Sequence, residues 1–327
     1  MKWLIIAVLL VVALAFPLFA DEFMVSILMQ AYLWAFLAMS WDVIGGYGGQ
    51  FSLGHAAFMG IGAYTSTILL ESYGVSPWVG IWVAGLMAGA AGALVGIVSL
   101  RLKGPFFALA TIAFAELVKL LLLYFKGITG GPLGILITKS GPEYMLFEEQ
   151  SSYYYLMLAL MLAGMLFLKW FETSKFGIGL VALREDEEAA EGVGINVYRT
   201  KVIGAAISAF LTGMGGTIYA QWIHFIRPDI IVKLEYSTQI AAIDVVGGAG
   251  SPYGGLIGAL ILVPLSLYLN AIFGGMIAGL SIILYGVVLL VVVVLVPGGI
   301  YGLIRRKLKS REKKEGEKGG RWRECLR

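Results

Sequence analysis

The chain is dominated by continuous apolar runs of about 20 residues, the length that an α-helix needs to cross a bilayer. Of its 327 residues, 59% are hydrophobic and 14% are charged, whereas about a quarter of the residues in a soluble domain are charged. The apolar residues form unbroken runs and do not alternate at every second position, which favours helices over a membrane barrel. We therefore expect an all-α, polytopic integral membrane protein.

Apolar length and turn signals divide the chain into about ten expected transmembrane helices. The eighth is short for a crossing and the third is rich in glycine, so segments 236–250 and 45–62 either span fully or are re-entrant. Met1–Ala20 also resembles a signal peptide, but Asp21 and Glu22 lead straight into another apolar run, which favours a first membrane helix. The expected spans are 3–20, 24–44, 56–70, 77–99, 105–125, 153–171, 200–222, 236–248, 254–272 and 276–297.

Lysine and arginine are distributed unevenly along this topology. Of the 24 basic residues, 19 fall in segments placed inside the cell, namely the N-terminus, 45–55, 100–104, 169–201 and the C-terminal tail. This bias is the positive-inside pattern, and it predicts a multi-pass protein of the cell (inner, cytoplasmic) membrane with both termini cytoplasmic. We divide the chain into a transmembrane domain, 1–304, and a basic tail, 305–327, expected to be disordered and to lie over an anionic membrane face.

Several chemistries are excluded by the residues present. One cysteine, Cys325, rules out an intrachain disulfide framework, and two histidines, His55 and His224, leave no cysteine- or histidine-based metal site. Ser52 and His55 do not match a nucleophile elbow, because Gln50 stands where that motif needs glycine. The chain has no phosphate-binding loop, so any ATP is bound by another polypeptide. The basic tail lacks the interleaved aromatic residues of a nucleic-acid site. We expect a non-enzyme without metal or cofactor.

The stretch Trp41–Tyr64 is too rich in glycine to be an ordinary spanning helix, and it carries polar side chains between its glycines. At membrane depth a broken backbone is tolerated only where protein buries it or where it lines a wet cavity. In transporters such segments point to the substrate site. We expect this stretch to form part of a solute path, and close helix packing through glycine is the alternative.

A second glycine motif resembles the first. IGGYGGQ at 44–50 and VGGAGSP at 246–252 each follow an apolar span that carries an aspartate, Asp42 or Asp244. Both aspartates are expected near cytoplasmic helix ends, where water lowers the cost of a charge and where they would act as caps or gating contacts. Glu116 and Lys119 lie three residues apart in one expected helix and are predicted to pair.

The segment Ser174–Lys201 is the one long, highly charged inside segment before the tail. Its middle, Ala182–Glu191, contains good helix formers, and Gly192 and Gly194 supply a stop. The expected helix combines small residues with a cluster of acids, which suits the docking of a cytoplasmic partner. A solvated linker helix is the alternative, and these residues alone leave both readings open.

Taken in order, five motifs resemble those of a known family. They are GGYGGQFSLGHAAFMGIGAY, KGPFFALATIAFAE, TGGPLGI, FGIGLVALREDEEAAEGVGINVYRTK and GGAGSPYGGLIGA. The stretch from about Asp42 to Leu303 resembles the branched-chain amino acid permeases of ABC importers, and is most similar to the larger of their two permease subunits.

The resemblance implies the permease fold of vitamin-B12- and ribose-type importers. It also implies a homologous second permease, two cytoplasmic ATPase subunits that hold the ATP, an extracytoplasmic solute-binding protein, and transport of branched-chain amino acids by alternating access. Importers of urea or short amides are the alternative within the class. An ATP-independent channel or ion-coupled carrier is the alternative outside it.

Together with the resemblance, the sequence assigns roles to residues in coupling loop 174–199, in the stretch Trp41–Tyr64 and in the second glycine motif. The residues expected to contact ATPase subunits are Ala182, Arg184, Glu185, Glu187, Glu188, Ala189, Ala190, Gly192 and Gly194. The glycines expected to act as gate or hinge are Gly45, Gly46, Gly48, Gly49, Gly247, Gly248 and Gly250. The residues expected along the substrate path are Tyr47, Gln50, Ser52, His55 and Tyr64.

Overall fold

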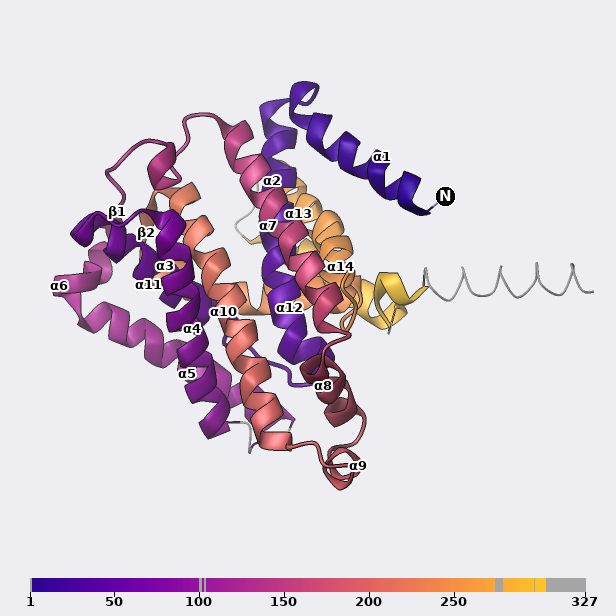
Figure 1. The fold of residues 1–327 in the computed structure, drawn as a ribbon. Coiled ribbons are helices and arrows are strands. Elements are labelled where there is room, and N and C mark those ends of the chain that lie inside the picture. Colours follow the sequence, from indigo (N-terminus) through magenta and orange to yellow (C-terminus); the bar gives the residue numbers. More distant parts are fainter. Residues whose placement is uncertain (1, 100–101, 103, 274–278, 297, 304–327) are drawn as a thin grey trace, which may run out of the picture.

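The structure is a computed structural model that describes residues 2–99, 102, 104–273, 279–296 and 298–303. The expected tail, 305–327, lies outside the described residues. The chain forms a bundle of long helices, with the short helix α9 at one end and the strand β1 towards the other (Figure 1). The longer helices are α1 (Lys2–Ala15), α2 (Glu22–Asp42), α3 (His55–Tyr73), α4 (Pro77–Ser99), α5 (Pro105–Tyr124), α7 (Gln150–Phe171), α8 (Lys175–Glu185), α10 (Val197–Ile223), α12 (Leu234–Gly247), α13 (Gly254–Phe273) and α14 (Leu280–Leu295).

Six helical segments in the described part of the chain are long and apolar enough to cross a membrane. The chain is therefore a largely helical, multi-pass membrane protein, as the apolar runs predicted. Of the other expected spans, 3–20 covers α1 and η1, 56–70 lies on α3, and 236–248 lies on α12, which has 14 residues. The tenth, 276–297, covers α14, which has 16 residues, and its positions 276–278 and 297 lie outside the described residues. The six segments are Glu22–Tyr47, Pro77–Val98, Pro105–Tyr124, Gln150–Phe171, Val197–Ile223 and Gly254–Phe273.

Helix α2 is the centre of the bundle. It packs against α7, α10, α12 and α13, and every residue from Ala31 to Asp42 is buried. Leu33 and Leu37 are completely enclosed, and Trp41 is 1% exposed. A helix that is apolar around its whole circumference is stable only when protein or lipid surrounds it, and here protein does.

Small residues set the spacing between α3, α4 and α10. A Cβ atom on Gly62 of α3 would lie 2.5 Å from the Cα of Gly213 on α10, and one on Gly216 would lie 2.8 Å from the carbonyl carbon of Met59. Such close approach of two backbones is how membrane helices gain packing energy, because burying apolar surface from lipid contributes little.

Short elements connect the helices at the end opposite α9. Strand β1 (Ile135–Leu136) pairs with β2 (Phe225–Ile226) in an antiparallel register, which joins the loop before α7 to the loop after α10. This two-residue pairing and an isolated antiparallel bridge between Gly141 and Leu146 depart from the expected all-helical chain. The remaining short elements are η1 (Phe16–Leu18), η2 (Val43–Tyr47), α6 (Lys126–Thr129), η3 (Gly131–Leu133), η4 (Pro142–Tyr144), α9 (Glu187–Gly192) and α11 (Pro228–Ile231).

One local prediction about this helical region is confirmed. The Nζ atom of Lys119 lies 3.0 Å from Oε1 of Glu116, one turn away on α5. The i,i+3 spacing brings the two side chains together without help from the rest of the fold.

Replacing Gly62 with valine tests the close contact between α3 and α10. The new side chain would overlap the backbone of Gly213, and overpacking of this kind costs about 1–3 kcal/mol or more. We expect the purified protein in detergent to melt at a lower temperature than the wild type. Gly286→Val on α14 is the matched control, because a Cβ atom at Gly286 meets nothing within 4 Å. Equal losses in both variants would contradict the packing argument.

Candidate functional site

The chain breaks where the first glycine motif predicts a break. After α2, residues Val43–Tyr47 form the π-helical turn η2, a wider turn that often marks a functional site. Gly49 then adopts the left-handed conformation, with φ of 64°, which glycine reaches without strain. The chain stays non-helical until α3 begins at His55.

The two glycine motifs, about 200 residues apart in sequence, touch each other. Oδ1 of Asp42 accepts a hydrogen bond of 2.5 Å from the backbone N–H of Gly250. Gly46 lies between these groups, and a Cβ atom there would overlap the Asp42 carboxyl group and the Gly250 backbone. The second motif follows α12, and its Gly248 has φ of 127°. We call this contact the glycine junction and define it by Asp42, Gly46 and Gly250.

The expectation that water surrounds Asp42 and Asp244 is wrong, because both residues are 0% exposed. The two aspartates do lie near helix ends, on the last turns of α2 and α12. However, α13 packs so closely on the end of α12 that a Cβ atom on Gly247 would lie 2.7 Å from the Gly258 amide nitrogen. Protein atoms therefore take the place of the expected water.

Arg184, the residue before the last on α8, reaches the glycine junction from outside. Its Nη1 donates a 2.9 Å hydrogen bond to the carbonyl oxygen of Gly46 in the π-helical turn. The aliphatic part of its side chain lies over Gly49, and Nη1 lies 2.9 Å from the position of a Cβ atom on Gly250. One guanidinium group therefore contacts both glycine motifs and also pairs with Glu185 at 2.8 Å.

The predicted single helix over Ala182–Glu191 is wrong in one respect, because the structure has two helices there. Asp186 is extended, with φ of −159° and ψ of 113°, and it separates α8 from α9. Its Oδ1 accepts hydrogen bonds from the N–H groups of Glu188 and Ala189 at 2.9 and 3.0 Å. Aspartate is a strong N-cap, and this capping competes with helix continuation. The predicted stop is observed, since α9 ends at Gly192.

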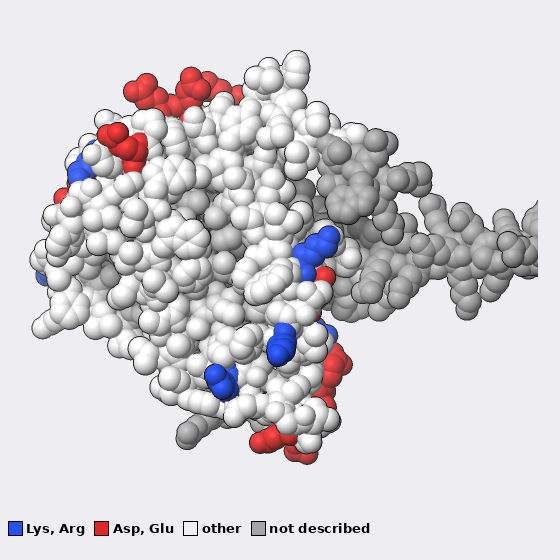
Figure 2. All heavy atoms as spheres, in the orientation of Figure 1, with Lys and Arg blue, Asp and Glu red and all other residues white. Residues whose placement is uncertain are grey.

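A buried ion pair fastens α9 to the bundle. Lys201, near the start of α10, is 2% exposed, and its Nζ atom pairs with Oε1 of Glu187 on α9. Ala190 is buried against the bundle, whereas Glu188 and Ala189 on α9 are exposed. Acidic side chains gather at this end of the molecule (Figure 2). Sequence reasoning missed the role of Lys201, although a lysine just inside a membrane span after an acidic helix was a usable signal.

His55 belongs to a chain of buried hydrogen bonds between α2, α3 and α10. Its Nδ1 lies 3.2 Å from Oγ of Ser52, and its Nε2 lies 2.9 Å from Oγ of Ser208. Ser208 donates to the Ser40 carbonyl oxygen at 2.6 Å, and Ser40 contacts Thr212 at 2.8 Å. Buried polar groups in membrane helices bond across helices in this way.

Most of the residues expected along the substrate path are buried in the bundle. Tyr47, Ser52, His55 and Tyr64 are buried, and Gln50 is half-buried. The cavity beside Ser52 and His55 has a volume of about 10 Å³, which is room for about one water molecule. In the described conformation this cavity is too small for an amino acid, so the role of these residues along a path stays a prediction.

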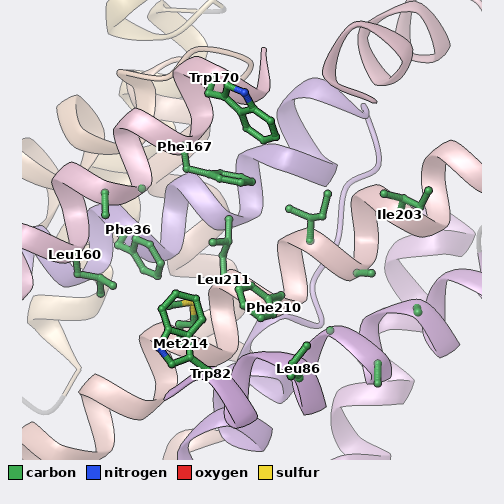
Figure 3. A pocket seen from close by; sticks show the side chains of 17 residues that line it. Phe36, Trp82, Leu86, Leu160, Phe167, Trp170, Ile203, Phe210, Leu211 and Met214 are labelled. Carbon is green, nitrogen blue, oxygen red and sulfur yellow. The ribbon is translucent and has the colours of Figure 1, made fainter. Parts of the chain in front are cut away.

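A larger groove of about 860 Å³ runs between α2, α4, α7 and α10. Figure 3 shows Trp82 and Trp170 on opposite sides of it, with Phe36, Phe167 and other apolar side chains between them. Its lining residues carry no charged side chain. Small-molecule sites need a few well-placed polar groups for orientation, so this groove does not suit a zwitterionic solute. Its lining residues are Phe36, Trp82, Leu86, Gly89, Ala90, Ala93, Leu160, Ala163, Gly164, Phe167, Trp170, Ile203, Ala206, Ile207, Phe210, Leu211 and Met214.

Two glycine-broken segments in contact inside a helical membrane bundle define a transporter-like protein. The chain belongs to the family described as branched-chain amino acid transport system / permease component, which matches residues 23–297. Family membership confirms the resemblance seen in the motifs, and it makes the chain a transmembrane ABC transporter permease.

Relatives with curated names agree with the family. The high-affinity branched-chain amino acid transport system permease protein LivM of Escherichia coli is 32% identical over 284 residues, which cover 80% of this chain and 67% of that protein. The probable branched-chain amino acid transport permease protein LivH of Methanocaldococcus jannaschii is 27% identical, covering 76% and 82%. The guanosine ABC transporter permease protein NupQ of Bacillus subtilis is 30% identical, covering 65% and 70%. No solved structure matches the chain.

The buried pair between Lys201 and Glu187 predicts an asymmetry between two single substitutions. The Lys201 side chain is 3% exposed and that of Glu187 is 29% exposed. Glu187→Gln leaves an unpaired buried cation, which costs about 3–5 kcal/mol, whereas Lys201→Met leaves a carboxylate that water reaches. We expect Glu187→Gln to lower the melting temperature more than Lys201→Met. The opposite order in thermal unfolding would show that this ion pair does not hold α9.

Proposed function

We propose that this chain is a transmembrane permease subunit of an ATP-driven importer of branched-chain, apolar amino acids. The observation that carries the proposal is the contact of Arg184 with both glycine motifs. It links α8, and through it the acidic helix α9, to the point where two membrane segments are broken. The family match to permease components and the likeness to LivM support the same reading.

A mechanism follows from these contacts. ATPase subunits dock on α9, whose exposed Glu188 and Ala189 leave a small, acidic surface. Displacement of α8 and α9 pulls on the Gly46 carbonyl through Arg184 and on α10 through Lys201. The glycine junction then opens, and the path switches between outward- and inward-facing forms. ATP binding shifts this equilibrium only because the ATPases hold the two forms with different affinity.

The proposal includes the wider assembly. The chain crosses the membrane about ten times, has the vitamin-B12- or ribose-type fold in residues 1–304, and pairs with a homologous second permease. Two ATPase subunits bind on the cytoplasmic side, and a solute-binding protein delivers solute from outside. Both termini are cytoplasmic, an orientation supported by the 19 of 24 basic residues that fall in the segments placed inside.

The predicted path residues fit this scheme as part of an inner gate. Tyr47 follows the glycines of η2, and Gln50 and Ser52 lie between η2 and α3. Opening of the glycine junction exposes these side chains to the path together with His55. Tyr64 lies farther along α3, where its hydroxyl donates to the Ile226 carbonyl oxygen of β2 at 3.5 Å, so it would meet the path towards the other end of the bundle. Weak contacts there suit a fast importer, because tight binding of solute slows its release.

A nucleoside is the second candidate solute. The relatives include a guanosine permease at 30% identity and a nucleoside permease of Lactococcus lactis at 25% identity. The branched-chain reading is preferred because the LivM relative covers more of this chain, 80% against 65% for the guanosine permease. Urea and short amides remain solutes to be compared in the same assay.

Reconstitution into liposomes tests the proposed function. We expect uptake of radiolabelled leucine when the chain is combined with its second permease, ATPase subunits, binding protein and ATP. We expect no flux from the chain alone. Flux from the chain alone would establish a channel or carrier instead. Preferred uptake of guanosine or urea in the complete system would assign a different solute.

The double substitution Glu188→Lys with Ala189→Trp tests docking at α9. It reverses one charge and adds bulk on the exposed surface of α9, so we expect ATP hydrolysis to continue while transport falls at least tenfold. Membrane insertion should be unchanged. Glu148→Lys is the control, since this exposed acid lies in the loop before α7, at the other end of the bundle (Figure 1). Normal transport by the double variant would exclude α9 as the docking element.

A further inference from the structure

Two carboxyl groups meet inside the bundle beside the glycine junction. Asp42 on α2 and Asp244 on α12 are both 0% exposed, and their carboxyl groups lie within hydrogen-bonding reach of each other. The pair occupies equivalent places in the two motifs, because each aspartate stands four residues before a glycine, Gly46 or Gly248. Neither the family match nor the proposed transport cycle gives this contact a role.

When both carboxyl groups are ionised, three of their four oxygen atoms lack a hydrogen-bond donor among the described residues. Oδ1 of Asp42 accepts from the Gly250 amide. Oδ2 of Asp42 and both carboxyl oxygens of Asp244 have no donor among the described residues. An ionised carboxylate can only accept, whereas a protonated one supplies an O–H donor. Buried polar atoms without partners are rare in folded proteins. A single proton on one of the two carboxyl groups would give a hydrogen-bond partner to two of the three unpaired oxygens.

The surroundings decide which aspartate carries the proton. Asp42 already accepts from Gly250, and the Ser251 amide and the Arg184 guanidinium also lie close to it. These groups favour a charged carboxylate at Asp42. Asp244 has no comparable donor or cation in the described part of the chain, and it faces the Asp42 carboxylate.

We infer that Asp42 and Asp244 form a proton-binding site in which Asp244 holds one proton and donates it to Oδ2 of Asp42. The O–H bond stays on Asp244, and Asp42 stays ionised with two hydrogen bonds. The pair then carries a single negative charge close to the positive charge of Arg184 on α8, which also pairs with the exposed Glu185. This hydrogen bond ties the end of α2 to the end of α12.

The other charged and titratable groups around the pair are few among the described residues. Tyr47 of η2 lies close enough to both aspartates to interact with them electrostatically, and its hydroxyl donates to Glu172 at 3.5 Å. Arg184 contributes from α8. From the second motif only backbone amides reach the pair, those of Gly250 and Ser251. Arg184 is thus the cation positioned to neutralise the junction, and its movement with α8 changes the balance of charge there.

The inference goes beyond the proposed function, because it holds whatever solute the chain carries. The contact between the two motifs, and with it the packing of α2 against α12, then depends on the bound proton. Separating α2 from α12 exposes a protonated carboxyl group to water, which lets the proton leave, and bringing them together requires a proton to return.

Infrared difference spectroscopy of the purified chain tests the site directly. We expect the wild type at neutral pH to show the carbonyl stretch of a protonated carboxyl group, and Asp244→Asn to lack it. Glu235→Gln is the matched control, because Glu235 is an exposed acid on the same helix, α12. It should leave the band unchanged. Absence of a band that Asp244→Asn removes would overturn the inference.

A comparison of asparagine with alanine separates the proton from a general packing role. The amide N–H of asparagine replaces the O–H donor of Asp244, so Asp244→Asn should melt within a few degrees of the wild type. Asp244→Ala removes the donor and should melt clearly lower. If Asp244→Asn fails to fold, or loses as much stability as Asp244→Ala, a shared proton is excluded. Selective stabilisation of the wild type by sodium or potassium, without the infrared band, would assign a metal cation in place of the proton.

Discussion

The contact between Gly46 and Gly250 is the constraint on which the other features depend. A side chain at Gly46 would occupy the space of the Asp42 carboxyl group, so two glycine motifs are needed for α2 and α12 to end against each other. Their approach encloses Asp42, supplies the Gly250 amide as its donor, and leaves the Gly46 carbonyl for Arg184. Close backbone approach is a general means of packing in membranes, and here it also gathers the charged groups.

Much of the fold could be predicted from local features of the sequence. Apolar length located the long helices, the glycines located the break after α2, and the spacing of Glu116 and Lys119 predicted their pairing. Each of these depends on residues close together in the chain. The meeting of the two motifs joins residues 208 positions apart, and composition carries no information about which distant segments touch.

The errors at the site have physical causes. Asp42 and Asp244 were placed in water because they stand near helix ends, but distance to a helix end says nothing about the helix that covers it. Helix formers on both sides of Asp186 predicted continuity, and the capping bonds of its side chain broke it. Polar residues such as His55 and Ser208 satisfy one another between helices, so polarity in a membrane span does not by itself distinguish a solute path from packing.

The bend at Asp186 has a mechanical consequence. A single straight helix would carry a push along its own axis and deliver it at one point. The bend creates two short arms that meet at an angle and are anchored separately, α8 by Arg184 and α9 by Lys201. A force applied at Asp186 would therefore move α8 and α9 in different directions, and each helix would transmit its movement to a different part of the bundle. Asp186 itself is exposed, so the surface of a docking partner can reach the point where the two helices meet.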